Sequence, residues 1–238
     1  MSECSELQAD ADLNAILAET KLAPACEGMS RKEVTALLSS ELVRLVLTRK
    51  NAYSYWAHEV EVYDESKGAT TWVDFMQFEP AGYHTATHPG NVERGTFSCY
   101  EVKSCIADIK SGHGLNWFGD ENFMVIPVEL YPKFKRAYHG SFEKNFEDRD
   151  EKLRKYIPSL SDFKFMFYGI SRNGRGAFRT IDDRMQRLPR TKPASELLLC
   201  MMRAMLADSD RSDVSHKIER SIDVDAHAGR LRGEGESE

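Results

Sequence analysis

Apolar residues recur every three or four positions after residue 33, which predicts a helix with one buried face. Ser30 and Glu33 have the spacing of a capping box, so the helix is expected to begin there. Glu41 lies within the apolar stripe. It is therefore expected either to turn its carboxylate inward or, with a slightly rotated helix, to be solvated. The apolar positions are Val34, Leu37, Leu38, Leu42, Leu45 and Val46.

Beyond residue 52 the pattern changes to that of β-strands. Residues 53–63 and 70–78 are rich in aromatic and β-branched residues, and the polar segment between them predicts a hairpin. Asn173-Gly174 between two apolar runs predicts a second hairpin. The order of these elements predicts an α/β fold with a mixed β-sheet flanked by helices. The other expected strands are 97–104, 123–128, 163–170 and 176–180, and the other expected helices are 105–110 and 193–208.

The patterning divides the 238 residues into one folded unit and two flanking segments. The folded domain is expected over 30–206, after an N-terminal extension at 1–29. Charged residues dominate 133–157, which predicts a solvated helical insertion. Residues 207–238 hold nine acidic and five basic residues and no aromatic residue, which is typical of a disordered tail.

Composition narrows the class of protein. Hydrophobic residues make up 41% and charged residues 29%, as in globular proteins. No apolar run is long enough to span a membrane, and the N-terminus lacks the basic and apolar parts of a secretory signal. The five cysteines are scattered, without zinc spacing. These features predict a reduced, cytoplasmic protein with no membrane partner.

The net charge of −6 conceals a basic stretch at 163–193, which holds eight Lys or Arg residues against two Asp residues. Such a stretch is a candidate phosphate-binding face, and Arg172, Arg175 and Arg179 are its candidate nucleic-acid contacts. The alternative is an ordinary solvated surface of helix and loop.

The strongest chemical signal is a pair of carboxylates on neighbouring predicted strands. Glu101 and Lys103 point to one face of their strand, because side chains alternate along a strand. On the preceding strand, Asp74 is expected to face away from Val73 and Phe75 and toward the same place as Glu101. Such a pair of oxygen ligands suits Mg²⁺ or Mn²⁺, and Glu41 is a candidate third ligand. The alternative is an exposed ion pair on an edge strand.

A metal held by these acids suits the hydrolysis of a phosphodiester, because the metal activates water and stabilises charge on the phosphoryl oxygens. Lys103 would hold the attacking water and the scissile phosphate. Two nearby residues have open interpretations. Asp108 is expected either to cap the helix at 105–110 or to contact DNA, and Trp117 either to stack on a base or to pack on the core.

Asp74 followed by Glu101-Val102-Lys103 on the next strand resembles the PD-(D/E)xK nuclease superfamily, which has a restriction-endonuclease-like fold. The stretch Tyr100–Lys110, with the apolar strand that follows it, is most similar to MmcB-like DNA-repair proteins and phage nuclease-like proteins. The resemblance covers about 30–206. Val73 stands where the superfamily name has proline.

The resemblance implies a Mg²⁺-dependent DNA endonuclease, exonuclease or repair nuclease of a bacterial or phage-infected cell. It implies metal binding by Asp74 and Glu101, catalysis by Lys103, and Glu41 as the acid from the helix. Two alternatives stay open: a catalytically weak DNA-binding or repair-accessory module on the same fold, and a protein–protein adaptor. The sequence is also compatible with a homo-oligomer.

Overall fold

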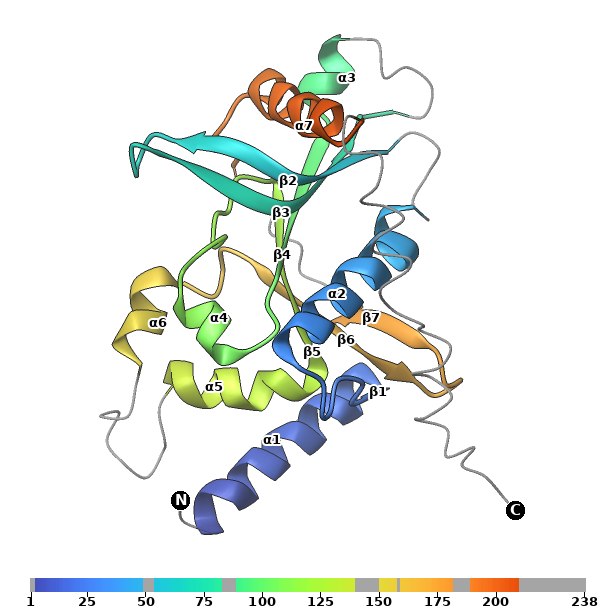
Figure 1. Cartoon of the computed structure of the whole chain (residues 1–238), viewed down its shortest axis with the longest axis vertical. Helices are drawn as coiled ribbons and strands as arrows, with labels where there is room; N and C mark the ends of the chain where they lie inside the picture. Colours follow the sequence, from blue (N-terminus) through green and yellow to red (C-terminus); the bar gives the residue numbers. More distant parts are fainter. Residues whose placement is uncertain are drawn as a thin grey trace.

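A mixed β-sheet runs through the centre of the molecule, with helices on both of its faces (Figure 1). The computed structural model describes residues 3–48, 54–82, 89–139, 150–157, 159–181 and 189–209. The strands are β1 (Leu22–Ala23), β2 (Tyr55–Asp64), β3 (Ala69–Glu79), β4 (Thr96–Val102), β5 (Glu121–Pro127), β6 (Lys164–Ser171) and β7 (Gly176–Thr180). The helices are α1 (Glu3–Thr20), α2 (Arg31–Leu42), α3 (Pro89–Glu93), α4 (Ile106–Lys110), α5 (Tyr131–His139), α6 (Glu151–Tyr156) and α7 (Ala194–Ser209), with a π-helical turn η1 (Val43–Leu47) after α2 and a 3₁₀ turn η2 (Val128–Leu130) before α5.

The strand order is β1-β6-β5-β4-β3-β2, and β7 also pairs with β6. The pairs β2–β3, β3–β4 and β6–β7 are antiparallel, while β4–β5 and β5–β6 are parallel. This arrangement confirms the predicted α/β fold with a mixed sheet, and both predicted hairpins are present. Among the described residues, no helix is both long and apolar enough to cross a lipid bilayer.

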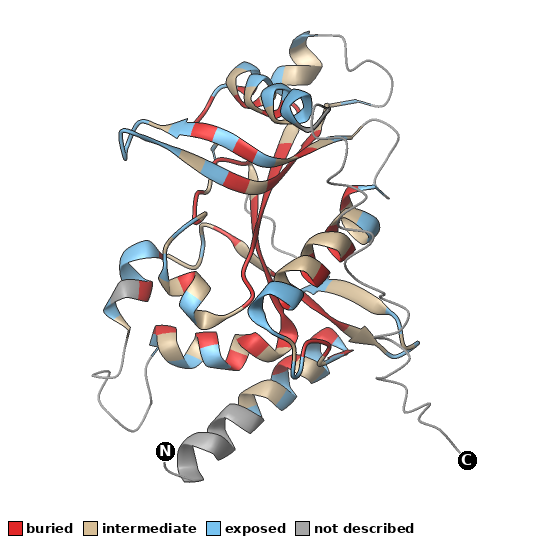
Figure 2. Cartoon of the chain, in the orientation of Figure 1, coloured by how far each residue is buried: buried red, intermediate tan, exposed pale blue. Residues whose placement is uncertain are grey.

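Strand β5 shows how the sheet separates two parts of the core. Phe123 and Val125 pack in the cluster that contains the apolar face of α2, whereas Met124 and Ile126 pack with α5. Alternate side chains of a strand point to opposite faces, so a strand buried on both faces is apolar throughout. Figure 2 shows this burial as a continuous red run along β4 and β5.

The hydrophobic core includes residues from both 1–29 and 133–157, the two segments that the sequence predicts to lie outside it. The sequence predicts an extension before residue 30, but Ile16 and Leu22 are buried in the core, and β1 pairs with β6. The charged segment 133–157 is not uniformly solvated, because Phe134 and Leu153 are buried. Apolar residues at i and i+4 give a helix a buried face even where charged residues dominate the composition. Residues 140–149 and the acidic tail beyond Ser209 lie outside the described residues.

The β2–β3 hairpin reverses its pleat half-way along. Val60 and Val73 pack under α7 together with Ala57 and Met76, although Ala57 and Val60 have opposite parity along β2, as do Val73 and Met76 along β3. Between them lies Glu59, a non-glycine residue with φ of +48°. A left-handed residue interrupts the alternation of side chains, so apolar residues on both sides of it can face α7.

This reversal corrects one sequence prediction. Val73 and Phe75 were expected on one face of β3, but Val73 packs with α7 and Phe75 packs with α2. Asp74 lies at the point where the side chains of β3 change from one face of the sheet to the other. In the β2–β3 register it stands opposite Glu59.

We predict that glycine is the better replacement at Glu59. Left-handed backbone costs a non-glycine residue about 1–2 kcal/mol, whereas glycine in a strand costs about 0.5–1 kcal/mol in chain entropy. Glu59→Gly should therefore be more stable than Glu59→Ala by about 0.5–1 kcal/mol in urea unfolding. At Glu61, on the same strand, alanine should be the more stable replacement. If alanine were the more stable replacement at both positions, or glycine at both, the result would contradict a strained backbone at Glu59.

Candidate active site

Asp74 and Glu101 meet where β3 separates from β4. The last paired residues of these strands are Phe75 and Tyr100, so Asp74 and Glu101 stand opposite each other in the next position. The Asp74 side chain continues the ladder, because its Oδ2 accepts a hydrogen bond from Val102 N at 2.8 Å. The structure thus brings together two carboxylates from neighbouring strands.

The Glu101 carboxylate is fully buried, and neither of its oxygens accepts a hydrogen bond. Its nearest cation is the Lys103 ammonium, with Nζ 3.9 Å from Oε2. Burial, reinforced by the negative charge of Asp74, raises the pKa of Glu101 well above its ordinary value. Burial also raises the pKa of Asp74, although Lys103 and the Val102 N–H oppose that shift.

The loop between α4 and β5 closes over this pair. Lys103 is buried, and its Nζ donates a hydrogen bond to the carbonyl oxygen of His113 at 2.8 Å. Gly114 has φ of +70°, and a Cβ at this position would overlap the Glu101 carboxylate. Only glycine suits both the backbone and the space. The Gly112-His113-Gly114 sequence lies near the expected site and is the signal for this loop, but it does not predict the contact of Gly114 with Glu101.

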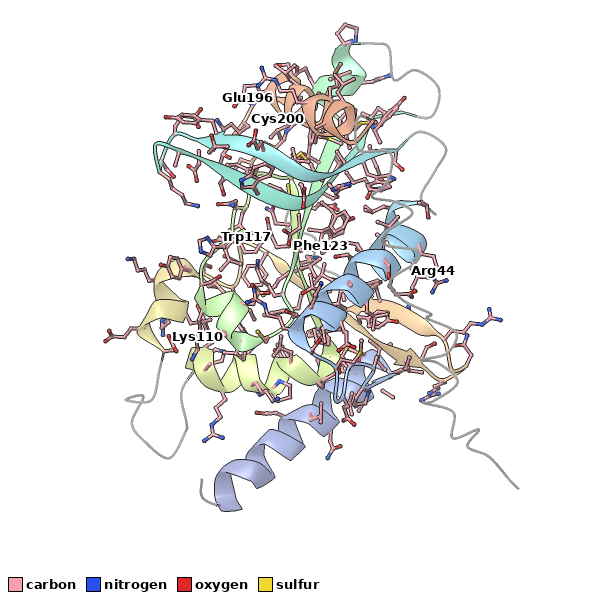
Figure 3. The ribbon with its side chains drawn as sticks, viewed as in Figure 1. Arg44, Lys110, Trp117, Phe123, Glu196 and Cys200 are labelled. Atoms are coloured by element: carbon pink, nitrogen blue, oxygen red, sulfur yellow. The ribbon has the colours of Figure 1, made fainter. Side chains whose placement is uncertain are left out.

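Glu41 is also buried, but its charge is already balanced. Its two oxygens accept hydrogen bonds from Arg44 Nε at 2.9 Å and Arg44 Nη2 at 2.6 Å. Arg44, labelled in Figure 3, projects from the end of the α2–η1 helix. Within the described ranges, no three acidic, histidine or cysteine side chains lie close enough to hold a metal ion. The pair formed by Asp74 and Glu101 therefore does not extend to Glu41.

The two residues whose roles were left open have structural partners. Asp108 lies within α4, whose N-cap residue Cys105 makes no side-chain cap; it accepts a hydrogen bond from Ser104 N at 3.3 Å and forms an ion pair with Arg31 at 2.9 Å. Trp117, labelled in Figure 3, stacks on Phe163 with ring centroids 4.6 Å apart. Trp117 therefore packs on the core.

A pocket of about 980 Å³ opens beside the carboxylates, between α2 and the β2–β3 hairpin. Asp74 and Lys103 lie at one part of it, together with the loop residues His113 and Gly114. Glu41 and Arg44 line the helical side of the same pocket. The structure thus places Glu41 in the same pocket as Asp74 and Lys103.

The described cations of the basic stretch at 163–193 do not form one continuous face, and Arg184 and Arg187 lie outside the described residues. Arg172, Arg175 and Arg179 are exposed on the β6–β7 hairpin and are not among the residues that line the pocket. Arg190 forms an ion pair with Asp120 at 3.2 Å.

Lys192 is buried and forms ion pairs with Glu65 and with Glu196. Glu196, labelled in Figure 3, lies on α7, whereas Glu65 lies in the β2–β3 turn. Lys192 therefore connects these two elements and is not available to bind phosphate.

Comparisons with known proteins assign no family to the chain. No protein-family model and no curated protein matches the chain. Among solved structures, the chain is similar to a protein of unknown function from Silicibacter pomeroyi, with 12% identity and a TM-score of 0.39. The similarity covers 81% of this chain and 95% of that one.

We predict that the stability of the fold depends on the charge of Glu101. Because its pKa is raised on folding, its protonated form contributes full stability below the pKa of the unfolded chain. That contribution is lost as the pH rises toward the folded-state pKa. Glu101→Gln cannot ionise, so its Tm should increasingly exceed that of the wild type between pH 5 and 8, by about 3–5 °C for each ~1.4 kcal/mol that the wild type loses.

The matched control is Glu93→Gln, which removes an exposed carboxylate. Its Tm should follow that of the wild type at every pH. Calorimetry that gives a pH-independent difference for Glu101→Gln would contradict a raised pKa of Glu101 in the folded protein.

Proposed function

We propose that this protein is a Mg²⁺-dependent nuclease that hydrolyses phosphodiester bonds in DNA. The observation that supports this function best is the convergence of Asp74, Glu101 and Lys103 beside one pocket. Two carboxylates from neighbouring strands and one ammonium just after β4 provide oxygen ligands for a hard cation and a positive charge next to them.

The donor set suits Mg²⁺ or Mn²⁺. Both oxygens of Glu101 are buried without a hydrogen bond, and a second carboxylate stands opposite them. A buried carboxylate whose nearest cation lies 3.9 Å away is costly, and a divalent cation would bind its oxygens directly. Asp74 and Glu101 would hold this ion, which supplies Lewis-acid stabilisation of the phosphate and a more acidic bound water.

The chain's own residues account for the rest of the proposed chemistry. The Val102 N–H holds Asp74 in place, so the carboxylate does not have to be ordered when substrate binds. Lys103 is held between Glu101 and the His113 carbonyl, where its ammonium would stabilise the negative charge that develops on a phosphoryl oxygen.

The order of the elements supports a restriction-endonuclease-like core. Helix α2 is followed by the antiparallel strands β2, β3 and β4, then by the short helix α4 and the parallel strand β5. This run carries the Asp74 and Glu101-Val102-Lys103 signature in the order expected from the resemblance.

A second candidate is a DNA-binding or repair-accessory module that does not cleave. The observation that favours it is the covering of Glu101 by Gly114, together with the hydrogen bond from Lys103 to the His113 carbonyl. In this state the loop occupies the space beside the carboxylate. A nuclease requires that the loop move when metal and substrate bind.

We predict that two substitutions separate metal binding from cleavage. Titration calorimetry should detect Mg²⁺ or Mn²⁺ binding to the wild type, and Asp74→Asn should abolish that binding and all cleavage of labelled DNA. Lys103→Met keeps both carboxylates and should bind metal, but its cleavage should fall by a factor of about 10² or more. Lys32→Met, which removes an exposed lysine of α2, is the matched control and should cleave normally.

If the wild type binds neither Mg²⁺ nor Mn²⁺, with or without DNA, the nuclease proposal fails. If it binds metal and DNA but cleaves neither single-stranded nor duplex DNA, the second candidate is preferred.

We predict that the arginines of the β6–β7 hairpin contribute to binding through phosphate contacts. Replacing Arg172, Arg175 and Arg179 with alanine should reduce the slope of log affinity against log salt by up to about 2–3, since each lost contact to duplex DNA changes it by about 0.9. The control variant K133A/K155A/R203A removes three exposed cations elsewhere. Equal slopes for the two variants would reject this hairpin as the phosphate face.

A further inference from the structure

The pocket is much larger than a metal site requires. Its volume of about 980 Å³ is near the upper end of the range for small-molecule sites, about 300–1,000 Å³. The side formed by the β2–β3 hairpin carries Trp56, His58, Phe75 and Trp72. Trp72 is 51% exposed although it is one of the largest apolar side chains in the protein. An exposed aromatic side chain in a pocket is a candidate contact for a flat ligand.

The aromatic side of the pocket is held in place by its own packing. The ring centroid of Phe75 lies 6.4 Å from that of Trp56 and 6.3 Å from that of His58. Phe75 is itself buried in the cluster beneath α2. These rings are therefore positioned before any ligand binds, which lowers the entropic cost of binding.

The opposite side of the pocket is polar. Helix α2 and the η1 turn contribute the hydroxyl groups of Thr35, Ser39, Ser40 and Thr48, and the guanidinium groups of Arg31 and Arg44. At about 1.5 Å per residue, Arg31 and Arg44 are about 20 Å apart along the helix. A ligand between the two sides thus meets aromatic rings on one side and hydrogen-bonding groups on the other.

The charges argue against a duplex as the ligand of this pocket. Its described lining residues include the cations Arg31, Arg44 and Lys103. The lining residues also include four acids. Arg31 pairs with Asp108 and Arg44 pairs with Glu41 within the same pocket. The acids are Glu41, Glu59, Asp74 and Asp108. Nucleic-acid backbones are bound mainly by Lys and Arg that neutralise phosphates, so this pocket offers little affinity for a phosphate backbone by charge alone. A nucleic acid bound here would have to be held by an accessible base, which a regular duplex does not offer.

On these grounds, and resting on the proposed nuclease function, we propose that the pocket binds an unpaired nucleotide of single-stranded DNA. Its base would stack on Trp72, and its phosphate would lie toward Asp74, Glu101 and Lys103. Base stacking on aromatic rings contributes affinity that does not depend on backbone charge. A regular duplex keeps its base faces stacked inside the helix, where Trp72 cannot reach them.

The test is equilibrium binding by fluorescence anisotropy in EDTA, where no metal-dependent cleavage occurs. The probes are an oligo-dT strand of about 12 nucleotides, an abasic strand of equal length and a blunt duplex. The wild type should prefer oligo-dT to both other probes. Trp72→Ala should weaken oligo-dT binding about 5- to 150-fold, the equivalent of about 1–3 kcal/mol for one stacked base, and Trp72→Phe should recover most of it.

Tyr55→Ala is the matched control, because Tyr55 is 46% exposed on the same hairpin and precedes Trp56, so it points to the other face. It should bind oligo-dT like the wild type, and all three variants should keep the wild-type Tm within a few degrees. Equal binding of oligo-dT and the abasic strand would overturn the proposal, as would equal losses in Trp72→Ala and Tyr55→Ala.

The outcome is independent of the metal test. Metal-dependent cleavage that is unchanged in Trp72→Ala would overturn the pocket assignment and leave the nuclease standing. A selective loss of oligo-dT binding in Trp72→Ala, in a protein that binds no metal, would support the pocket assignment and overturn the nuclease.

Discussion

The burial of two neighbouring carboxyl groups is the constraint around which this structure is arranged. Asp74 and Glu101 stand opposite each other because β3 and β4 pair in a register that leaves no other position for them. Their charge is offset by the Val102 N–H and by the ammonium of Lys103. Such a site costs folding energy, and natural proteins keep costly buried charges mainly where a function requires them.

The surrounding core supplies the rigidity that holds this pair. Strand β5 is buried on both faces and lies beside β4, so the strand that carries Glu101 cannot shift without disturbing two hydrophobic clusters. The hairpin of β2 and β3 is fixed from the other side by α7, and Lys192 links its turn to that helix. The left-handed Glu59 lets the hairpin keep its apolar residues under α7 while Asp74 lines the pocket.

Short-range periodicity predicted most of the elements and the pairing of Asp74 with Glu101, because both depend on alternation and chain order. The pleat reversal at Glu59 has no such signal, since glutamate rarely adopts a left-handed conformation. The pairing of Lys192 with Glu65 was also unpredictable, because the two residues are 127 positions apart along the chain. Charge-rich composition concealed the buried face of α5, on which Phe134 lies.

The contact between Gly114 and Glu101 ties two distant positions of the sequence to each other. A side chain at 114 fits only if the carboxylate at 101 withdraws, and the shorter arm of aspartate is the simplest way to withdraw it. A side chain at position 114 therefore requires a change at position 101, and even then the φ of +70° strains its backbone, whereas position 101 can change while residue 114 stays glycine. A set of related sequences in which residue 114 varies while residue 101 stays glutamate would have to fold the α4–β5 loop differently.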